Sequence, residues 1–198
     1  MFTPAEGTPA PSAFLGGDGL VDTADPDVVA LATEIRSRSE SDVDYARQAY
    51  EWVRDEVTHS VDAGDTLVTM AAGEVLRARR GLCFAKSHLY AALLRREGIP
   101  GALCYQRLGD GDGGFILHGI VAVHLEGEWH RQDPRGNGPG MDAQFSLVDE
   151  KLVWSADEAS GEIDYPVLFA QPADVVVAAL ESSEDALELC ATGLPSEL

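Results

Sequence analysis

The hydrophobic pattern changes its period once along the chain, between Gly98 and Pro100, and this change limits the folds that the chain can adopt. Before Gly98, apolar residues recur at steps of three and four, which is typical of helices that bury one face. After Pro100, short apolar runs are separated by glycine-rich turns, which is typical of antiparallel strands. Helices followed by a meander of strands predict an α+β fold.

Turn and capping signals divide this pattern into elements. Helices are expected at about 26–38, 41–58, 69–80, 82–98 and 172–180 and from 183 onward, and strands at 102–108, 115–125 and 128–132. Thr69 is the expected N-cap of the third helix. The fourth helix, which begins at Leu82 or Cys83, has the clearest limits because Gly98 and Pro100 close it.

Charge and cysteine content limit the partners and the compartment. Lys and Arg number 14 against 34 Asp and Glu, a net charge of −20 that opposes binding to a nucleic-acid backbone. The sequence has no apolar run of membrane-spanning length, and Met1 to Pro4 lack the features of a signal peptide. Three widely spaced cysteines suit free thiols in a reducing compartment. We therefore expect a cytoplasmic protein without nucleic-acid or membrane partners; its oligomeric state stays open.

Cys83 is the first candidate for chemistry, because it lies on the first turn of the fourth expected helix. Unpaired amides and the helix dipole favour a thiolate there, and the same amides could hold an oxyanion. The alternative is a small buried hydrophobic residue, which is the commoner role of a cysteine.

A thiol nucleophile needs a base, and His118 lies in the 115–125 strand. Asp133 follows the next strand, across a turn at Glu126 and Gly127. Antiparallel pairing around that turn brings positions near 118 and 133 to the same end of the ribbon, so that a carboxylate can orient the imidazole. This spacing predicts a Cys-His-Asp arrangement.

Six short motifs together resemble the core of the transglutaminase-like superfamily. They are Ala72 to Leu76, Arg80 to Ala85, Leu93 to Pro100, His118 to Val123, Gly127 to Trp129 and Gln132 to Pro134. The resemblance implies a papain-like fold, with Cys83 at a helix N-terminus packed on an antiparallel sheet. It also implies a catalytic triad of Cys83, His118 and Asp133 that transfers the acyl group of an amide.

The sequence departs from the family pattern near two of these residues. Ile120 stands where the family commonly has tryptophan, and Phe84 to Lys86 stand where it often has an acid. The twenty residues before Cys83 contain no glutamine, so a second oxyanion donor is unassigned. These departures indicate a distant subfamily, and the substrate is not carried over.

Length and resemblance together predict one transglutaminase-like domain over residues 1–198. Residues 1–24, which are rich in glycine and proline, are expected to form a loosely ordered arm. Residues 50–137 form the expected catalytic core, and 138–198 are an extension that packs on it. With 45% hydrophobic residues, the chain can bury a sizeable core.

Other histidines fit the role of base less well. His124 and His130 lie near the far end of the ribbon, about 20 Å along an extended strand from His118. His59 and His88 are expected to be surface or packing residues. Cys104 and Cys190 are expected to fill the core.

No metal or cofactor is expected. Zinc ligands usually occur as close pairs, which the sequence lacks. Asp110 and Asp112 give the 109–114 loop some likeness to a calcium loop, but its later carboxylate is missing. We expect this loop to be a flexible lip of the active-site cleft instead, and the acidic stretch 157–165 to be a solvated loop that could form one wall. Trp129 is a better candidate than Trp154 for a residue of the site, because it lies shortly before Asp133 in the sequence.

The sequence therefore predicts thiol-dependent acyl transfer at an amide or peptide bond. Hydrolysis, as by a peptidase, amidase or deamidase, is favoured because water is the default acceptor; the substrate is a peptide, a protein or a small amide. The alternatives are a crosslinking transglutaminase, a non-catalytic binding module on the same fold, and a redox-active thiol protein. Cations at 79, 80, 86, 95 and 96 would favour a thiolate if they approach Cys83.

Overall fold

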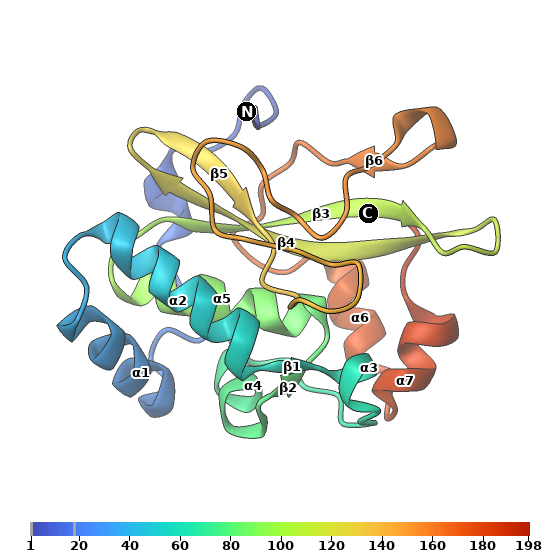
Figure 1. Cartoon of the computed structure of the whole chain (residues 1–198), viewed down its shortest axis with the longest axis horizontal. Helices are drawn as coiled ribbons and strands as arrows, with labels where there is room; N and C mark the ends of the chain where they lie inside the picture. Colours follow the sequence, from blue (N-terminus) through green and yellow to red (C-terminus); the bar gives the residue numbers. More distant parts are fainter. Residues whose placement is uncertain (1, 18) are drawn as a thin grey trace.

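The computed structural model describes residues 2–17 and 19–198, and it has a helical layer on one side of an antiparallel sheet (Figure 1). Met1 and Asp18, which belong to the expected arm, lie outside the described residues. The helices are α1 (Pro26–Ser37), α2 (Asp42–Glu56), α3 (Ser60–Ala63), α4 (Ala72–Ala78), α5 (Cys83–Arg96), α6 (Asp174–Glu181) and α7 (Ala186–Glu188). Other helical turns are η1 (Pro11–Phe14), η2 (Glu158–Ser160) and η3 (Leu189–Gly193). The expected α+β class is confirmed.

The short helix α3 was not expected from the sequence. The four helices expected before Gly98 are present as α1, α2, α4 and α5, with one difference in capping. The third begins at Ala72 and not at Thr69, whose hydroxyl instead donates to the carbonyl of Arg80 at 3.0 Å. Glu74 accepts the amides of Met70 and Ala71 and so caps this helix from its first turn. No helix of the described chain is both long and apolar enough to cross a bilayer.

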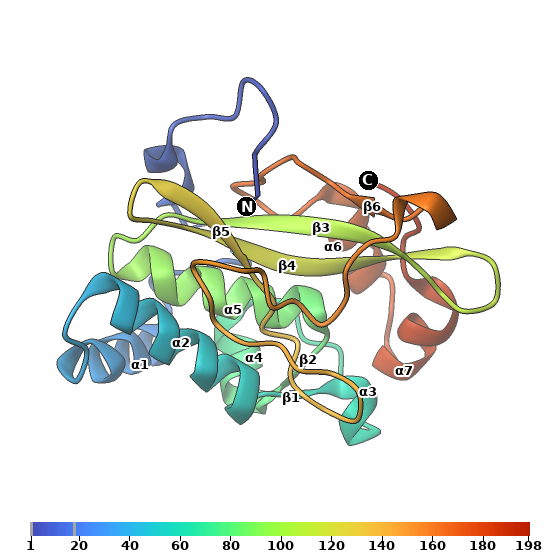
Figure 2. The same ribbon diagram turned by 45° about the horizontal axis from the view of Figure 1, so that its top comes forward.

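The main sheet has the order β5-β4-β3-β6, built from β3 (Gly101–Gly109), β4 (Phe115–Leu125), β5 (Glu128–Gln132) and β6 (Ile163–Asp164). Helix α5 runs beneath β3 and β4 (Figure 2). Alternate residues such as Leu103, Tyr105 and Val121 join the core shared with the helices. Their neighbours Cys104 and Ile120 join a smaller apolar cluster. Both faces of the central hairpin are therefore buried.

The N-terminal arm is packed, contrary to the expectation of a loosely ordered segment. Phe14 is 1% exposed, and its ring meets that of Trp129 edge to face at 5.2 Å. Val21 is buried, and the carbonyl of Gly16 accepts a hydrogen bond from Arg95. Proline and glycine exclude long helices here, but two aromatic residues, Phe14 and Phe2, attach the arm to the sheet.

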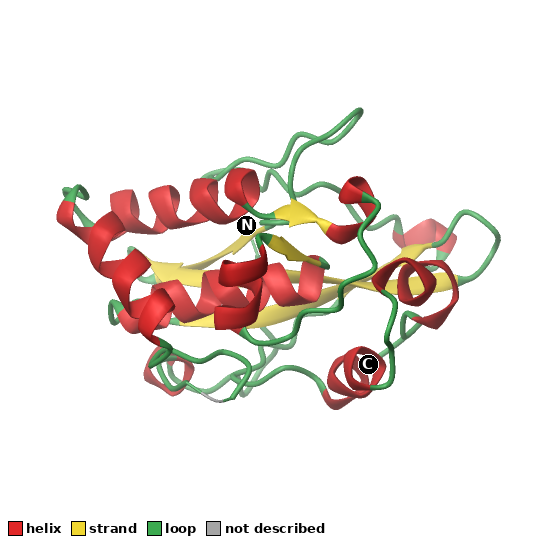
Figure 3. Ribbon diagram, turned by 90° about the horizontal axis from the view of Figure 1, so that it is seen from below, coloured by secondary structure: helices red, strands yellow, loops and turns green. Residues whose placement is uncertain are grey.

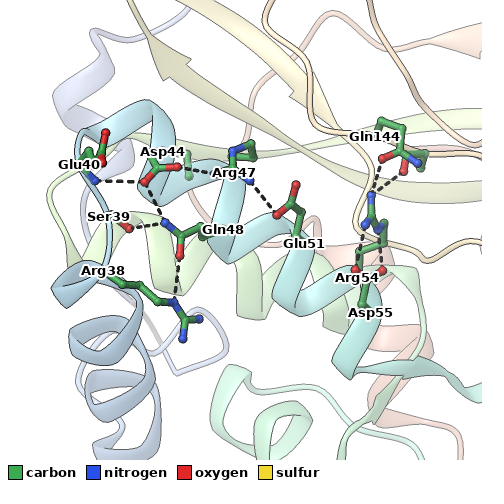
Figure 4. Close-up of polar contacts among 12 residues, drawn as sticks. Arg38, Ser39, Glu40, Asp44, Arg47, Gln48, Glu51, Arg54, Asp55 and Gln144 are labelled. Atoms are coloured by element: carbon green, nitrogen blue, oxygen red, sulfur yellow. Dashed lines mark hydrogen bonds and ion pairs between the residues drawn. The ribbon is translucent and has the colours of Figure 1, made fainter.

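The C-terminal extension consists of a long irregular segment, which crosses in front of the sheet, and of α6 and α7, which lie near the β3–β4 hairpin (Figures 1 and 3). Side chains from α2 and β5, which come earlier in the chain, hold the irregular segment in place. Arg54 of α2 donates to Ala143 and Gln144, as Figure 4 shows for Gln144. Gln132 exchanges two hydrogen bonds with the backbone of Ser146.

The structure also has a second, two-stranded sheet that the sequence did not predict. Strand β1 (Thr58–His59) pairs in parallel with β2 (Arg80–Gly81), in the register His59 with Gly81. Strands of two residues give too short a pattern for periodicity to detect. This pair ties the end of α2 to the residues directly before α5.

Candidate active site

Cys83 is the first residue of α5, after Leu82 as N-cap. Its backbone amide is among the four that have no partner within the helix. The thiol is largely buried and lines a cleft of about 490 Å³. A cysteine in this position meets a partial positive charge from the helix N-terminus, which stabilises a thiolate.

His118 of β4 and Asp133 after β5 lie together, as the turn between the strands predicts. The Nε2 atom of His118 is 2.9 Å from Oδ2 of Asp133, and both side chains are buried. This contact leaves Nδ1 for the thiol of Cys83. The backbone amides of Arg135 and Val153 also donate to the Asp133 carboxylate, each at 3.1 Å.

The charges of this site favour an imidazolium. Burial alone lowers the pKa of His118, but the charges of Asp133 and Cys83, with hydrogen bonds to both side chains, outweigh burial and raise the pKa to about 10. Burial raises the pKa of Asp133, yet the charge of His118 and the hydrogen bonds to the carboxylate outweigh it and lower the pKa. The imidazole of His118 is therefore protonated at neutral pH.

Gly119 lets α5 approach β4 beside these groups. A Cβ at position 119 would lie 2.6 Å from a ring carbon of Phe84 and 3.2 Å from the Cα of Phe84. The hydroxyl of Ser87 donates to the Gly119 carbonyl at 3.2 Å. Because any larger residue would push the helix away, glycine here sets the separation of thiol and imidazole.

Trp154 packs on His118 and Arg135 lies beside Trp154 in the cleft, and neither residue was expected in the site. The Trp154 ring meets the His118 ring edge to face, with centroids 5.0 Å apart. Arg135 lies 5.7 Å from the Trp154 ring and pairs with both carboxylate oxygens of Asp62, at 2.7 and 3.0 Å. Trp129, the better candidate by its place in the sequence, packs instead on Phe14 and does not line the cleft.

His59 lines the cleft together with Cys83 and His118. From sequence His59 is expected to be a surface or packing residue, and no local signal places it in the cleft, because its position depends on the β1–β2 pair. His88, by contrast, is a packing residue, buried with its Nδ1 atom 2.8 Å from the Met70 carbonyl.

The remaining walls of the cleft are mainly apolar. They include Val61, Leu108, Gly109, Ile116, Leu117, Ser155, Glu162, Cys190 and Leu194. Two of these come from the expected lip and the acidic stretch, at Gly109 and Glu162. Cys104 fills the core as expected. Cys190 is half-buried against the core and also lies in the cleft wall. The amide of Leu117, next to His118, donates to the carbonyl of Pro195 at 2.7 Å.

Two sequence-based alternatives receive other roles. One oxygen of Asp110 accepts the amides of Asp112 and Gly114, so this carboxylate closes the turn. Four of the cations near α5 have partners other than the thiol. Arg95 donates to Gly101 and Gly16, and Lys86 donates to the carbonyls of Arg54 and Val57. Arg79 pairs with Glu56, and Arg80 pairs with Asp65. The charged groups placed at the Cys83 end of α5 are therefore the helix N-terminus and His118.

Comparisons with known proteins agree with this architecture. A candidate cysteine protease from Cytophaga hutchinsonii has a similar structure, with a TM-score of 0.52 and 20% identity over 62% of this chain and 40% of that one. The periplasmic domain of TgpA from Pseudomonas aeruginosa matches with a TM-score of 0.44 and 23% identity, over 56% of this chain and 42% of that one. No protein of curated function matches the sequence. The chain thus spans less than half of these solved chains. The likeness to the first of them concerns the fold alone.

The sequence profile described as transglutaminase-like superfamily matches residues 29–134, more than half of the chain. This range includes Cys83, His118 and Asp133, and also His59. The profile, the order of the helices and strands and the helix-borne thiol all agree. The chain belongs to the transglutaminase-like superfamily.

Proposed function

We propose that this chain is a cysteine hydrolase that cleaves an amide or peptide bond with Cys83, His118 and Asp133. The observation that carries the proposal is the buried His118–Asp133 contact of 2.9 Å, with the second ring nitrogen left for a thiol at a helix N-terminus. A thiol, a base and a group that orients the base are the parts that nucleophilic acyl transfer needs. A purely structural role would not require these three residue types to lie together.

The first half of the reaction forms a thioester. The Cys83 thiolate attacks the carbonyl carbon, and the C=O electron pair moves to oxygen, which becomes an oxyanion near the α5 amides. The oxyanion then collapses, the C–N bond breaks, and the leaving nitrogen takes the proton from His118. Asp133 holds the ring so that its other nitrogen faces the thiol.

The second half returns the enzyme to its starting state. Neutral His118 removes a proton from water as the oxygen attacks the thioester carbonyl, and the C–S bond breaks. The products are a carboxylic acid and the thiolate, with the proton again on His118. We propose water as the acceptor; an amine in its place would give crosslinking.

The cleft supports an apolar group next to the reacting carbonyl, because Leu108, Ile116 and Trp154 line it. The proposed substrates are therefore peptides, proteins or small amides with an apolar side chain beside the reacting bond. The net charge of −20 makes a nucleic acid an unfavourable partner.

Mass spectrometry of a peptide library containing Gln, Asn and varied backbone bonds tests the proposal. Wild type should replace an amide NH2 by OH or split a backbone, and Cys83→Ala should do neither. Cys190→Ala is the matched control, because Cys190 lines the same cleft, and it should stay active. Joined peptides with loss of ammonia would indicate crosslinking, and an unchanged library with wild type would indicate a binding module.

A further inference from the structure

The proposed reaction needs two donors for the oxyanion, and the sequence identifies only the amides at the start of α5. The cleft contains a polar group that the triad does not use. His59 is 6% exposed and lines the cleft, and among the described residues its buried Nδ1 atom has no hydrogen-bond partner. Burying an unpartnered polar atom is unfavourable, and this is uncommon for a histidine that only packs. Because the ring also lines the cleft, a ligand there can reach its other nitrogen, Nε2.

The backbone places His59 beside the thiol. Its strand, β1, pairs in parallel with β2 in the register His59 with Gly81. Paired strands lie about 4.8 Å apart, and Gly81 is only two residues before Cys83. The pair therefore fixes the His59 backbone next to the start of α5. The Arg135–Asp62 pair holds α3, which begins directly after His59, from the other side.

His59 has the charge state of a donor and not that of a second base. Burial, followed by the charges of Arg135, Lys86 and His118, lowers its pKa to about 3, and only Asp62 acts in the opposite direction. The ring is therefore neutral at neutral pH and carries one N–H. A neutral imidazole can donate to a developing oxyanion without competing with His118 for the proton.

We infer that His59 is the second oxyanion donor, whose ring N–H binds the carbonyl oxygen of the substrate together with the backbone amide of Cys83. This inference rests on the proposed hydrolase activity, and it assigns His59 as a further catalytic residue. Its function is limited to the steps in which a carbonyl becomes tetrahedral. Attack of the same thiol on an alkyl halide forms no oxyanion and needs no such donor.

That difference gives the test two readouts. His59→Phe keeps a flat ring and removes the donor, and His59→Gln keeps a side-chain N–H. We expect His59→Phe to lower kcat for amide hydrolysis by about 10²- to 10³-fold, the loss typical of one oxyanion donor, and His59→Gln to recover part of it. Alkylation of Cys83 by iodoacetamide should keep its wild-type rate in both variants.

An equal fall in hydrolysis and alkylation would overturn the inference, because His59 would then only position the thiol. Unchanged hydrolysis in His59→Phe would overturn it as well. If His59→Phe does not fold, His59→Met removes the donor with a flexible side chain and carries the same comparison. A wild type that is alkylated at Cys83 but hydrolyses no amide would contradict the proposed function itself, whatever the His59 variants do.

Discussion

His118 and His124 lie six residues apart on β4, and each ring meets a tryptophan edge to face, Trp154 at 5.0 Å and Trp129 at 5.1 Å. Their surroundings differ in one respect. His124 lies opposite Trp129 in the regular β4–β5 ladder. His118 lies beyond the last pair of that ladder, where the chain has left the sheet and can supply Asp133 to its ring.

The difference shows how the sheet creates a candidate site. Inside the ladder, the cross-strand neighbour of a histidine is fixed by register, and its backbone groups are already paired. Past the end of β5, the chain turns and presents both a carboxylate and the backbone amides of Arg135 and Val153. The same histidine–tryptophan contact is therefore packing at one end of β4 and part of a polar network at the other.

The largest expected effect comes from removing each histidine in turn. His118→Ala should lower kcat/KM for an amide substrate by about 10²- to 10⁴-fold, because it removes the proposed acid and base. His124→Ala should leave kcat/KM near the wild-type value. Equal losses in the two variants, measured on folded protein, would contradict the assignment of the reaction to the His118 end.

The tryptophans should separate stability from activity. Trp129 is 9% exposed and packed on Phe14, so Trp129→Ala should lower the free energy of unfolding by about 3–5 kcal/mol with little change in kcat. Trp154 is 41% exposed, and Trp154→Ala should cost less than about 1 kcal/mol. Because Trp154 covers the His118 ring, the same variant should lower kcat by about 10- to 100-fold. Denaturant titration and initial rates measure the two quantities, and a reversed pattern would refute this division of roles.

The pH dependence of hydrolysis should report the charge of Asp133. The pKa of His118 is raised to about 10, so activity should fall on the alkaline side as the imidazolium loses its proton near that pH. Asp133→Asn removes the charge that favours the imidazolium, and the alkaline limb should move about 1–3 pH units lower. If the alkaline limb of the pH–rate profile does not move in Asp133→Asn, a group other than the His118–Asp133 pair controls that limb.

The raised pKa of His118 also predicts how the stability of the fold depends on pH. The folded-state pKa of His118 lies above its ordinary value of 6.5, so the ion pair stabilises fully below pH 6.5 and is lost as pH rises through about 10. On the acid side, the lowered pKa of Asp133 keeps the pair intact until the carboxylate is protonated. The difference in unfolding free energy between wild type and Asp133→Asn should therefore shrink above pH 6.5.

The residues predicted from sequence are those whose positions follow from local rules. A helix start places Cys83, and one tight turn brings Asp133 to His118. His59 and Trp154 could not be found in this way, because their positions depend on long-range contacts. His59 needs a two-residue strand pair, and the segment that carries Trp154 is held by side chains of α2 and β5.

The arm shows the same limit. Its prolines and glycines correctly exclude long helices, but periodicity cannot show that Phe14 finds Trp129 on a distant strand. Ile120, which departs from the family pattern, belongs to this same cluster under the arm.

The smallest expected effect concerns the edge of β4 itself. At His124 that edge pairs with β5, whereas beside His118 the amide of Leu117 donates to the carbonyl of Pro195, and Leu194 forms a wall of the cleft. An extended peptide could bind by adding a strand to this edge only if the amide were free. Removal of residues 194–198 should therefore raise kcat/KM several-fold for long peptides and leave a small amide substrate unaffected. Removal of residues 197–198 alone, which keeps Pro195, is the control, and an equal gain for both substrates would mean that the segment limits access in general and not the edge of β4.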